Sequence, residues 1–297
     1  MSEIAVIGEA LVDVLHQGDT AHNVPGGSPM NVAVGLARLG RPTRFISALG
    51  DDEYGALIRR HLSENSVSIE ADMLERTSTA HATIGSNGAA TYDFDIDWRI
   101  REPSVSMQTP LLHIGSIAAV VEPGASIVAS AAHNRPPDTL LSIDPNIRPQ
   151  IIGNWANALA ALEELFGTAD IVKMSDEDSS WLYPRLSPDG VLDHMLGLGA
   201  ELVVITHGAA GARIATPCDR LTSQAPQVTV ADTIGAGDSF MAGLIHSLLQ
   251  EPEPLTALGS EQIDRIARFA GVCAAVTVSR VGANPPRITE LAPDSNQ

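Results

Sequence analysis

Cysteine is scarce in this chain, since Cys218 and Cys273 are the only two among 297 residues. Two isolated thiols without metal-binding spacing argue against disulfide bonds and a sulfur-bound metal, and they indicate a reduced, cytoplasmic protein. We expect both side chains to be small, buried hydrophobic residues. The sequence therefore gives no reason to assign a function to either thiol.

Long apolar runs are absent as well. No stretch of 18 or more apolar residues occurs, so no segment is predicted to span a membrane. The first residues, MSEIAVIGEALVDV, carry acids in and around their apolar stretch and no basic segment, which argues against a secretory signal.

Basic residues are few: 18 lysines and arginines stand against 36 acidic residues, for a net charge of −18. Such a surface repels nucleic acids and anionic membranes, so we expect neither as a partner. Any anion must be held by local amides and a metal ion against the overall field. Lys173 is the one lysine, which we interpret as a compositional bias without a role in mechanism.

Two familiar nucleotide-binding strings are also missing. Without GxxxxGK[ST] the chain is not a P-loop kinase, and without GxGxxG after the first strand a dinucleotide enzyme is disfavoured. Strand-like and helix-like segments alternate instead, with no internal repeat. This order predicts an α/β protein with a mostly parallel sheet and helices on both faces.

The most informative stretch is DTIGAGDSF at residues 232–240. The alternation at 227–231 predicts a strand before it, and apolar residues at helical spacing predict a helix after it. Small residues before a helix allow an anion to bind the free amides. Asp238 lies in that first turn, where it could remove a proton from an attacking hydroxyl. The alternative is an ordinary turn in which Asp238 only favours the helix dipole.

Polar residues near the ends of other predicted strands are further candidates. Asp13 follows the apolar run 4–8 and is either a strand-end cap or a ligand for hydroxyl groups. Gly26 and Gly27 precede a helix that Ser28 is predicted to cap and that ends at Gly40. These two glycines either let a ligand lie on the backbone or only make a flexible turn.

Three later strand ends carry similar patterns. Asn146 and Arg148 follow the strand at 140–143, where they either bind a ligand or make a capped turn with Arg148 in a salt bridge. The acids after the strand at 170–175 either hold magnesium or cap a helix. The glycines after the strand at 202–206 either bind a ligand or only turn a hairpin.

Residues 79–96 predict a β-hairpin with Asn87-Gly88 as its turn. Because two strands alone are marginally stable, the hairpin is expected to cover something. Trp98 at its end either stacks on a ligand or belongs to the core of this covering layer, and we favour the core. The buried strand at 111–116 contains His113, which we interpret as a core histidine.

The string at 232–240 resembles the C-terminal signature of the ribokinase-like (PfkB) family of sugar kinases, and GGSPMN at 26–31 resembles its N-terminal signature. The resemblance covers nearly the whole chain. It implies a ribokinase-like three-layer αβα sandwich, one domain over 1–297, with a small β-sheet lid from about 10–24 and 77–108. It also implies that Asp238 is the catalytic base.

The same resemblance assigns the other site residues. It implies an anion hole at Gly235, Ala236 and Gly237. It implies sugar contacts from Asp13, Gly26, Gly27, Asn31, Asn146 and Arg148, and ATP contacts from Thr206, Gly208, Gly211, Ala270 and Ala274. The family pattern Asn-x-x-Glu, which organises Mg²⁺, reads Ser175 to Asp178 here, so Asp178 or Glu177 would serve. Asp232 and Thr233 are the candidates near a monovalent cation such as K⁺.

The resemblance therefore implies ATP-dependent phosphorylation of a primary hydroxyl of a sugar. Fructose is the first choice because the DPNIR string at 144–148 is similar to that of bacterial fructokinases. 2-Keto-3-deoxygluconate, whose carboxylate could bind Arg148, is the second, and ribose or a nucleoside follows. A sensor that binds sugar or nucleotide without chemistry is the rival from another class. The apolar hairpin face could pair two lids in a homodimer.

Overall fold

The computed structural model describes residues 2–17, 20–84 and 90–291. In this part of the chain a nine-stranded sheet forms the centre, in the order β13-β12-β11-β10-β9-β8-β1-β4-β5. All pairs from β11 to β5 are parallel, and β12 and β13 add an antiparallel edge. The strands are β1 Ile4–Ile7, β4 Thr43–Gly50, β5 Ser68–Leu74, β8 Leu111–Gly115, β9 Leu140–Asp144, β10 Ile171–Ser175, β11 Leu202–Thr206, β12 Ala212–Ala215 and β13 Arg220–Ser223.

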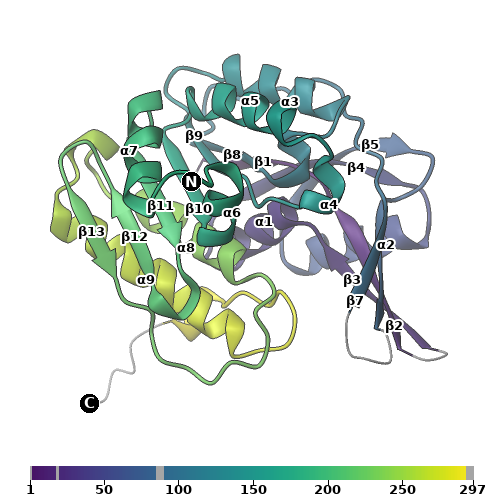
Figure 1. Ribbon diagram of the computed structural model, residues 1–297. Helices are drawn as coiled ribbons and strands as arrows, with labels where there is room; N and C mark the ends of the chain where they lie inside the picture. The colour runs from purple at the N-terminus through teal and green to yellow at the C-terminus, as the bar shows by residue number, and fades with distance from the viewer. Residues whose placement is uncertain (1, 18–19, 85–89, 292–297) are drawn as a thin grey trace.

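Helices cover both faces of this sheet, with α3 and α5 on one side and α8 and α9 on the other (Figure 1). Strand β1 shows why: Ile4 and Val6 pack into one hydrophobic core, and Ala5 and Ile7 pack into the other. A continuous apolar run fits a strand buried on both faces. The predicted three-layer α/β fold is confirmed.

The helices fall into two groups by the core they contact. One core contains α1 Ser28–Arg38, α2 Glu53–Glu64, α8 Ala236–Leu248 and α9 Ser260–Val278, and the other contains α3 Gly124–His133, α5 Trp155–Phe166, α6 Asp176–Leu182 and α7 Pro188–Leu198. The short helix α4 spans Pro149–Ile152. The 3₁₀ turns are η1 Ser116–Ala119, η2 Gly208–Ala210, η3 Leu255–Ala257 and η4 Ile288–Glu290.

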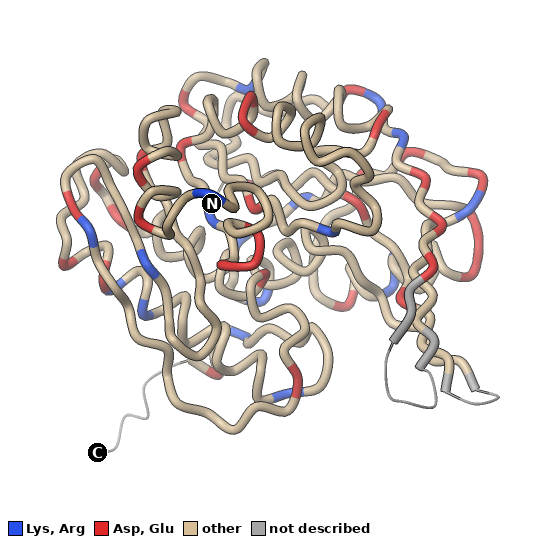
Figure 2. Tube along the Cα trace, viewed as in Figure 1, with Lys and Arg blue, Asp and Glu red and all other residues tan. Residues whose placement is uncertain are grey.

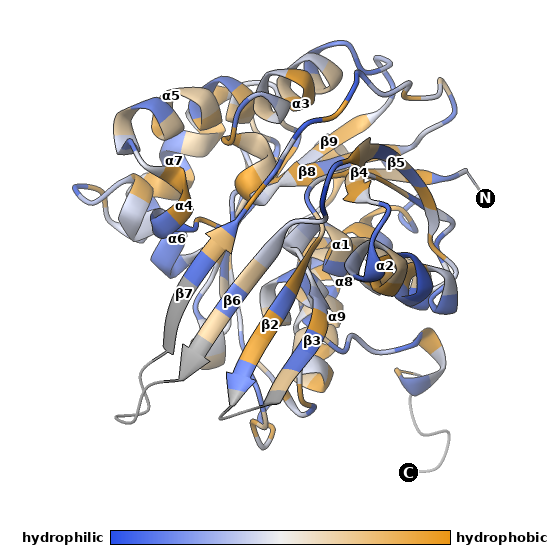
Figure 3. Ribbon diagram, turned by 90° about the vertical axis from the view of Figure 1, so that its right-hand side faces the viewer, coloured by the Kyte–Doolittle hydropathy of each residue, from blue (hydrophilic) through white to orange (hydrophobic). Residues whose placement is uncertain are grey.

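A second, four-stranded sheet projects from the main body of the molecule (Figure 3). Its order is β3-β2-β6-β7, with β2 parallel to β6 and the other two pairs antiparallel. The predicted hairpin corresponds to β6 and β7, whereas its Asn87-Gly88 turn lies outside the described residues. The strands are β2 Leu11–Gln17, β3 Thr20–Gly26, β6 Thr79–Ile84 and β7 Ala90–Asp95.

Trp98 lies in the core, but not in the core of this small sheet. It is almost fully buried in the hydrophobic cluster beneath α3 and α5, and its Nε1–H donates to the Ala118 carbonyl (3.1 Å). A Cβ on Gly124 would lie 2.3 Å from its ring. The indole therefore packs against the main body and is not available to stack on a sugar.

The predicted strand at 227–231 is wrong. Residues 224–230 form no strand, and Val228 and Val230 are 43% and 58% exposed. The amides of Ala231 and Asp232 donate instead to the Val278 carbonyl at the end of α9. Polar–apolar alternation is shared by strands and extended loops, and residues 224–230 pair with no strand in the described part of the chain.

Asp52 and Ser28 lie at the starts of two helices and differ in role. Asp52 caps α2, accepting a hydrogen bond from the Gly55 amide (2.7 Å). Ser28 does not cap α1, because Gly27 is the N-cap and Ser28 is the first helical residue. Its hydroxyl points to another segment, described below.

The remaining expectations concern thiols and the membrane. Cys273 is buried as expected, but Cys218 is exposed because it lies in the turn between β12 and β13. His113 is buried, with Nδ1 3.0 Å from the Ser142 hydroxyl, as expected of a core histidine. In the described ranges we find no helix with the length and apolar character needed to cross a bilayer.

Candidate active site

Asp238 lies in the first turn of α8, directly after the glycine-containing turn 235–237. Gly235 is the N-cap and adopts a left-handed conformation (φ 76°). A Cβ at this position would lie 2.7 Å from the Ala283 side chain, so both conformation and space require glycine. The predicted loop-to-helix geometry at this signature is therefore present.

The Asp238 carboxylate is held by two residues of the N-terminal signature. Ser28 Oγ donates to Oδ1 (2.6 Å), and Asn31 Nδ2 donates to Oδ2 (2.8 Å). We expected Ser28 to cap a helix and Asn31 to contact the sugar. The structure places both on Asp238, which is 9% exposed. Since an ionised carboxylate has about four acceptor sites, both oxygens retain room for a further donor.

The amides of the turn have few partners within the helix. Ala236 N–H makes a long hydrogen bond to the Thr233 carbonyl (3.3 Å), whereas Ser239 N–H closes the first helical bond on Gly235 (2.9 Å). The first amides of a helix lack internal acceptors and carry partial positive charge. This turn can therefore bind an anion.

A cavity of about 330 Å³ opens beside this turn. Thr233, Ala236 and Gly237 line one side of it. Four of the predicted ATP-contacting residues also line it, namely Thr206, Gly208, Gly211 and Ala274. Ala270 does not: it is fully buried, where α9 packs closely on Gly243 of α8.

Asp13 lies on β2 next to the two glycines of the N-terminal signature. A Cβ on Gly26 would lie 2.3 Å from Asp13 Oδ2, and one on Gly27 (φ 119°) would lie 2.6 Å from the Glu9 carbonyl. Burial raises the pKa of Asp13 to about 6, although the positive charge of Arg148 opposes this shift. The glycines are thus needed for close approach and are more than a flexible turn.

Contacts join these groups into one site. Gly26 touches Asp13, Ser28 and Asn31 bind Asp238, and Gly237 borders the cavity. The N-terminal signature therefore contacts Asp13 through Gly26 and Asp238 through Ser28 and Asn31, next to the turn that borders the cavity.

Comparisons with known proteins agree with this arrangement. The sequence profile of the pfkB family carbohydrate kinases matches residues 1–290. The chain belongs to this family. The recognition from sequence and the assignment to the ATP-dependent carbohydrate kinases are confirmed.

Individual relatives lead to the same family. A fructokinase of Rhizobium leguminosarum bv. trifolii is 34% identical over 258 residues, covering 82% of this chain and 79% of the relative. A Vibrio cholerae O395 fructokinase with fructose, ADP and a potassium ion has a TM-score of 0.84 at 28% identity, over 95% and 94% of the two chains. A fructokinase from Xylella fastidiosa with bound ATP has the same fold (TM-score 0.87, 24% identity, 97% of each chain).

Glu9 lies next to the N-terminal signature, since a Cβ on Gly27 would lie 2.6 Å from its carbonyl, and it was not among the expected site residues. It follows β1, is nearly fully buried, and accepts a hydrogen bond at Oε2 from the Ala118 amide (3.1 Å). Burial raises its pKa to about 7, against the lowering effects of a Ser116 hydrogen bond and the charge of Arg148. The sequence feature that could have identified Glu9 is its position two residues after the end of the first strand.

Arg148 is exposed, and its guanidinium donates to the backbone carbonyls of Asn146 (3.5 Å) and Ile147 (3.0 Å). No carboxylate forms an ion pair with it among the described residues, so the salt-bridge alternative is not supported. Asn146 has a positive φ of 35°, which is rare outside glycine and occurs often at functional sites. Both residues lie in the loop after β9.

The acids at the start of α6 are mainly a helix cap. Asp178 Oδ2 accepts from the Ser175 amide and hydroxyl, and Oδ1 accepts from the Ile147 amide (2.8 Å). Glu177 is exposed. Within the described ranges no three acidic, histidine or cysteine side chains form a metal-binding group. Asp178 therefore fixes the Asn146–Arg148 loop. Glu177, which is exposed, is the more accessible of the two carboxylates for a metal ion.

Asp232 connects two loops beside the anion-binding turn. Its Oδ1 accepts from the Ile234 amide (3.1 Å) and its Oδ2 from the Gly282 amide (2.8 Å). Thr233 borders the cavity, and its carbonyl accepts a hydrogen bond from the Ala236 N–H. These contacts fix the shape of the turn.

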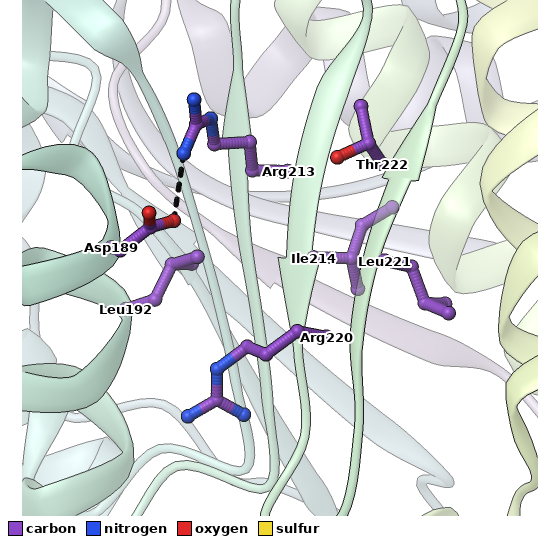
Figure 4. A pocket seen from close by; sticks show the side chains of 7 residues that line it. All are labelled: Asp189, Leu192, Arg213, Ile214, Arg220, Leu221 and Thr222. Atoms are coloured by element: carbon purple, nitrogen blue, oxygen red, sulfur yellow. Dashed lines mark hydrogen bonds and ion pairs between the residues drawn. The ribbon is translucent and has the colours of Figure 1, made fainter.

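A smaller cavity of about 130 Å³ lies between α7 and β12–β13 (Figure 4). Arg213 pairs there with Asp189 (2.7 Å), and Arg220 pairs with Asp193 (2.8 Å). None of the predicted site residues lines it. The larger cavity is therefore the candidate nucleotide site.

Proposed function

We propose that this kinase transfers the γ-phosphoryl group of ATP to the primary hydroxyl of fructose, forming fructose 6-phosphate. The observation that carries the proposal is the pair of hydrogen bonds from Ser28 and Asn31 to Asp238, which joins the segment of Gly26 and Gly27 beside Asp13 to the turn that borders the cavity. The similarity to fructokinases supports the choice of sugar.

In this mechanism Asp238 accepts the proton of the attacking hydroxyl. Ser28 and Asn31 fix the carboxylate, which leaves a free lone pair for the substrate. The amides of 235–237 stabilise the negative charge on the transferring group. Phosphoryl transfer depends mainly on positioning and charge stabilisation, so these groups suffice for the protein's part.

The sugar binds against Asp13, Gly26, Gly27, Asn146 and Arg148 in this proposal. The four-stranded sheet, within the segments 10–24 and 77–108, acts as a lid on a single kinase domain spanning 1–297. Lid closure would exclude water and suppress ATP hydrolysis. Leu15 and Val24, both 40% exposed on β2 and β3, offer apolar surface for pairing two lids in a homodimer. Light scattering of the purified protein tests the dimer.

ATP occupies the 330 Å³ cavity in this proposal, and Mg²⁺ binds its phosphates. Mg²⁺ in such enzymes is held by one or two carboxylates, substrate phosphates and water, so Glu177 beside Asp178 fits this modest demand. The ion, when bound, neutralises phosphate charge. The Vibrio cholerae fructokinase contains potassium, and we place an equivalent K⁺ near Asp232 and Thr233.

2-Keto-3-deoxygluconate is the second candidate substrate. Among the described residues the guanidinium of Arg148 forms hydrogen bonds with backbone carbonyls and no ion pair, and a carboxylate substrate would supply a strong bidentate partner. Fructose has no group that needs this charge. Arg148→Met should therefore affect the carboxylate sugar far more than fructose.

A coupled ADP-release assay with fructose, 2-keto-3-deoxygluconate, ribose and no sugar tests the proposal. We expect sugar-dependent ADP release that is greatest with fructose, with ³¹P NMR showing a phosphate on C6. Asp238→Asn is the negative control. No increase of ADP release with any sugar would reject the kinase reaction, and strong preference for the keto-acid would replace fructose as substrate.

A further inference from the structure

The one lysine of the chain lies in the active-site region. Lys173 is the central residue of β10, and its Nζ donates to Asp144 Oδ2 at the end of β9 (2.7 Å). The two side chains are 4% and 2% exposed. The pair is therefore almost fully removed from water.

The ammonium group lies directly against the anion-binding turn. A Cβ built on Gly237 would be 2.8 Å from Lys173 Nζ. Gly237 is thus the residue that lets the backbone approach this charge, while its other side borders the nucleotide cavity. The positive charge and the helix amides act at the same place.

The surrounding acids keep this lysine charged. Burial alone would lower the pKa of Lys173, but Asp144, Asp178 and Asp238 together raise it. One oxygen of this arrangement, Asp144 Oδ1, is buried without a hydrogen-bond partner. Asp144 therefore directs its single bond to Lys173 and is otherwise left unsatisfied.

Burying such an ion pair costs free energy, because both charges lose their hydration. A buried ion pair can often be replaced by apolar side chains without loss of stability, and an unpaired buried oxygen adds a further cost. The overall charge of −18 makes anion binding unfavourable at long range. A fixed positive charge behind the amides offsets this at short range.

We propose that Lys173 is a positioning residue for phosphoryl transfer. Asp144 holds its ammonium group against Gly237, where it supplies fixed positive charge behind the turn that receives the phosphoryl group. This inference rests on the proposed function. Lys173 acts through the turn and does not touch the substrate. Its effect should appear in kcat and in γ-phosphate binding, with sugar KM unchanged.

Three variants separate this role from a structural one. Lys173→Met leaves Asp144 buried and unpaired, and Asp144→Asn removes the partner that holds Lys173. Lys173→Met/Asp144→Asn removes both charges and should regain most of the Tm lost in the single variants. Arg135→Met is the matched control, because Arg135 pairs with Asp170 (3.4 Å) in another part of the fold.

We expect kcat of the double variant to remain at least roughly tenfold below wild type, which is less than the roughly 10²–10³-fold loss on removing a direct oxyanion donor. Arg135→Met should lower Tm without this kcat loss. Recovery of both Tm and kcat in the double variant would show a purely structural pair and overturn the proposal.

An NMR experiment on the Lys173 side chain tests the proposal without measuring turnover. Because the chain has one lysine, ¹⁵N-lysine labelling without a lysine-containing tag gives one side-chain ammonium signal. We expect the β,γ-imido analogue of ATP with Mg²⁺ to shift this signal more than ADP does. Equal shifts would overturn the proposal even if the double variant failed to fold. Absence of sugar kinase activity in the wild type would instead reject the proposed function.

Discussion

Asn31 donates a 2.8 Å hydrogen bond to Asp238, although the two residues are 207 positions apart in the chain. Together with Ser28, it connects α1 to the first turn of α8. The Asp238 carboxylate is thus oriented by the segment that also carries Gly26 and Gly27. In the proposed mechanism, this contact links the sugar-binding segment to the proton acceptor.

Asp238→Asn should lower kcat by roughly 10²–10⁴-fold, the usual contribution of a general base. The amide keeps the shape of the carboxylate but cannot accept the proton. Fructose binding should survive and is measured by calorimetry. Asp189→Asn, at the distant small cavity, is the control. A kcat loss below threefold would remove Asp238 from the chemical step.

Ser28→Ala should lower kcat by about tenfold, because a hydrogen bond to a charged group contributes about 1.5 kcal/mol or more. The methyl side chain fits the same space but leaves Asp238 Oδ1 without this donor. Steady-state kinetics should show kcat falling more than the fructose KM rises. An unchanged kcat would mean that Asn31 alone suffices to orient the carboxylate.

Asp13→Ala should raise the fructose KM by roughly 10- to 100-fold, as expected when one charged acceptor of sugar hydroxyls is lost. The ATP KM should stay near its wild-type value, since Asp13 lies on β2 and does not border the nucleotide cavity. An unchanged sugar KM would exclude Asp13 from the sugar site.

The sequence predicted those parts of the site that depend on neighbouring residues. Gly235 to Asp238 form one turn, and their string alone indicates a loop entering a helix. The fold class follows from the alternation of elements and from strands that are apolar on both faces. Local pattern was therefore enough for the framework and for the position of Asp238 in the first turn of α8.

Contacts between distant segments could not be predicted in this way. Ser28 follows the pattern of a helix cap, yet the packing of α1 on α8 turns its hydroxyl to Asp238. The alternation at 227–231 suits a strand, but these residues pair with no strand among those that the structure describes. The sequence also did not indicate that Lys173 lies beside Asp144 and Gly237. Acidic residues, by contrast, are spread over the whole molecule (Figure 2).

Glu9 should make stability depend on pH. Its pKa in the folded protein is about 7 against 4.5 for the free side chain, because burial disfavours the charged form. Between these values the folded state binds more protons than the unfolded state. Glu9 therefore contributes stability that is fully present below about pH 4.5 and is lost as pH rises through 7.

Glu9→Gln tests this directly, because the amide stays neutral at every pH and has nearly the same size. Asp13 and Asp144, whose pKa values burial raises to about 6, shift stability in the same direction but are present in both proteins. Urea unfolding at pH 5 and pH 8 should therefore show a smaller loss of stability in Glu9→Gln than in wild type. The difference should be on the order of 3 kcal/mol at most. Equal losses in the two proteins would mean that Glu9 is already ionised at pH 5, held so by Ala118, Ser116 and the charge of Arg148.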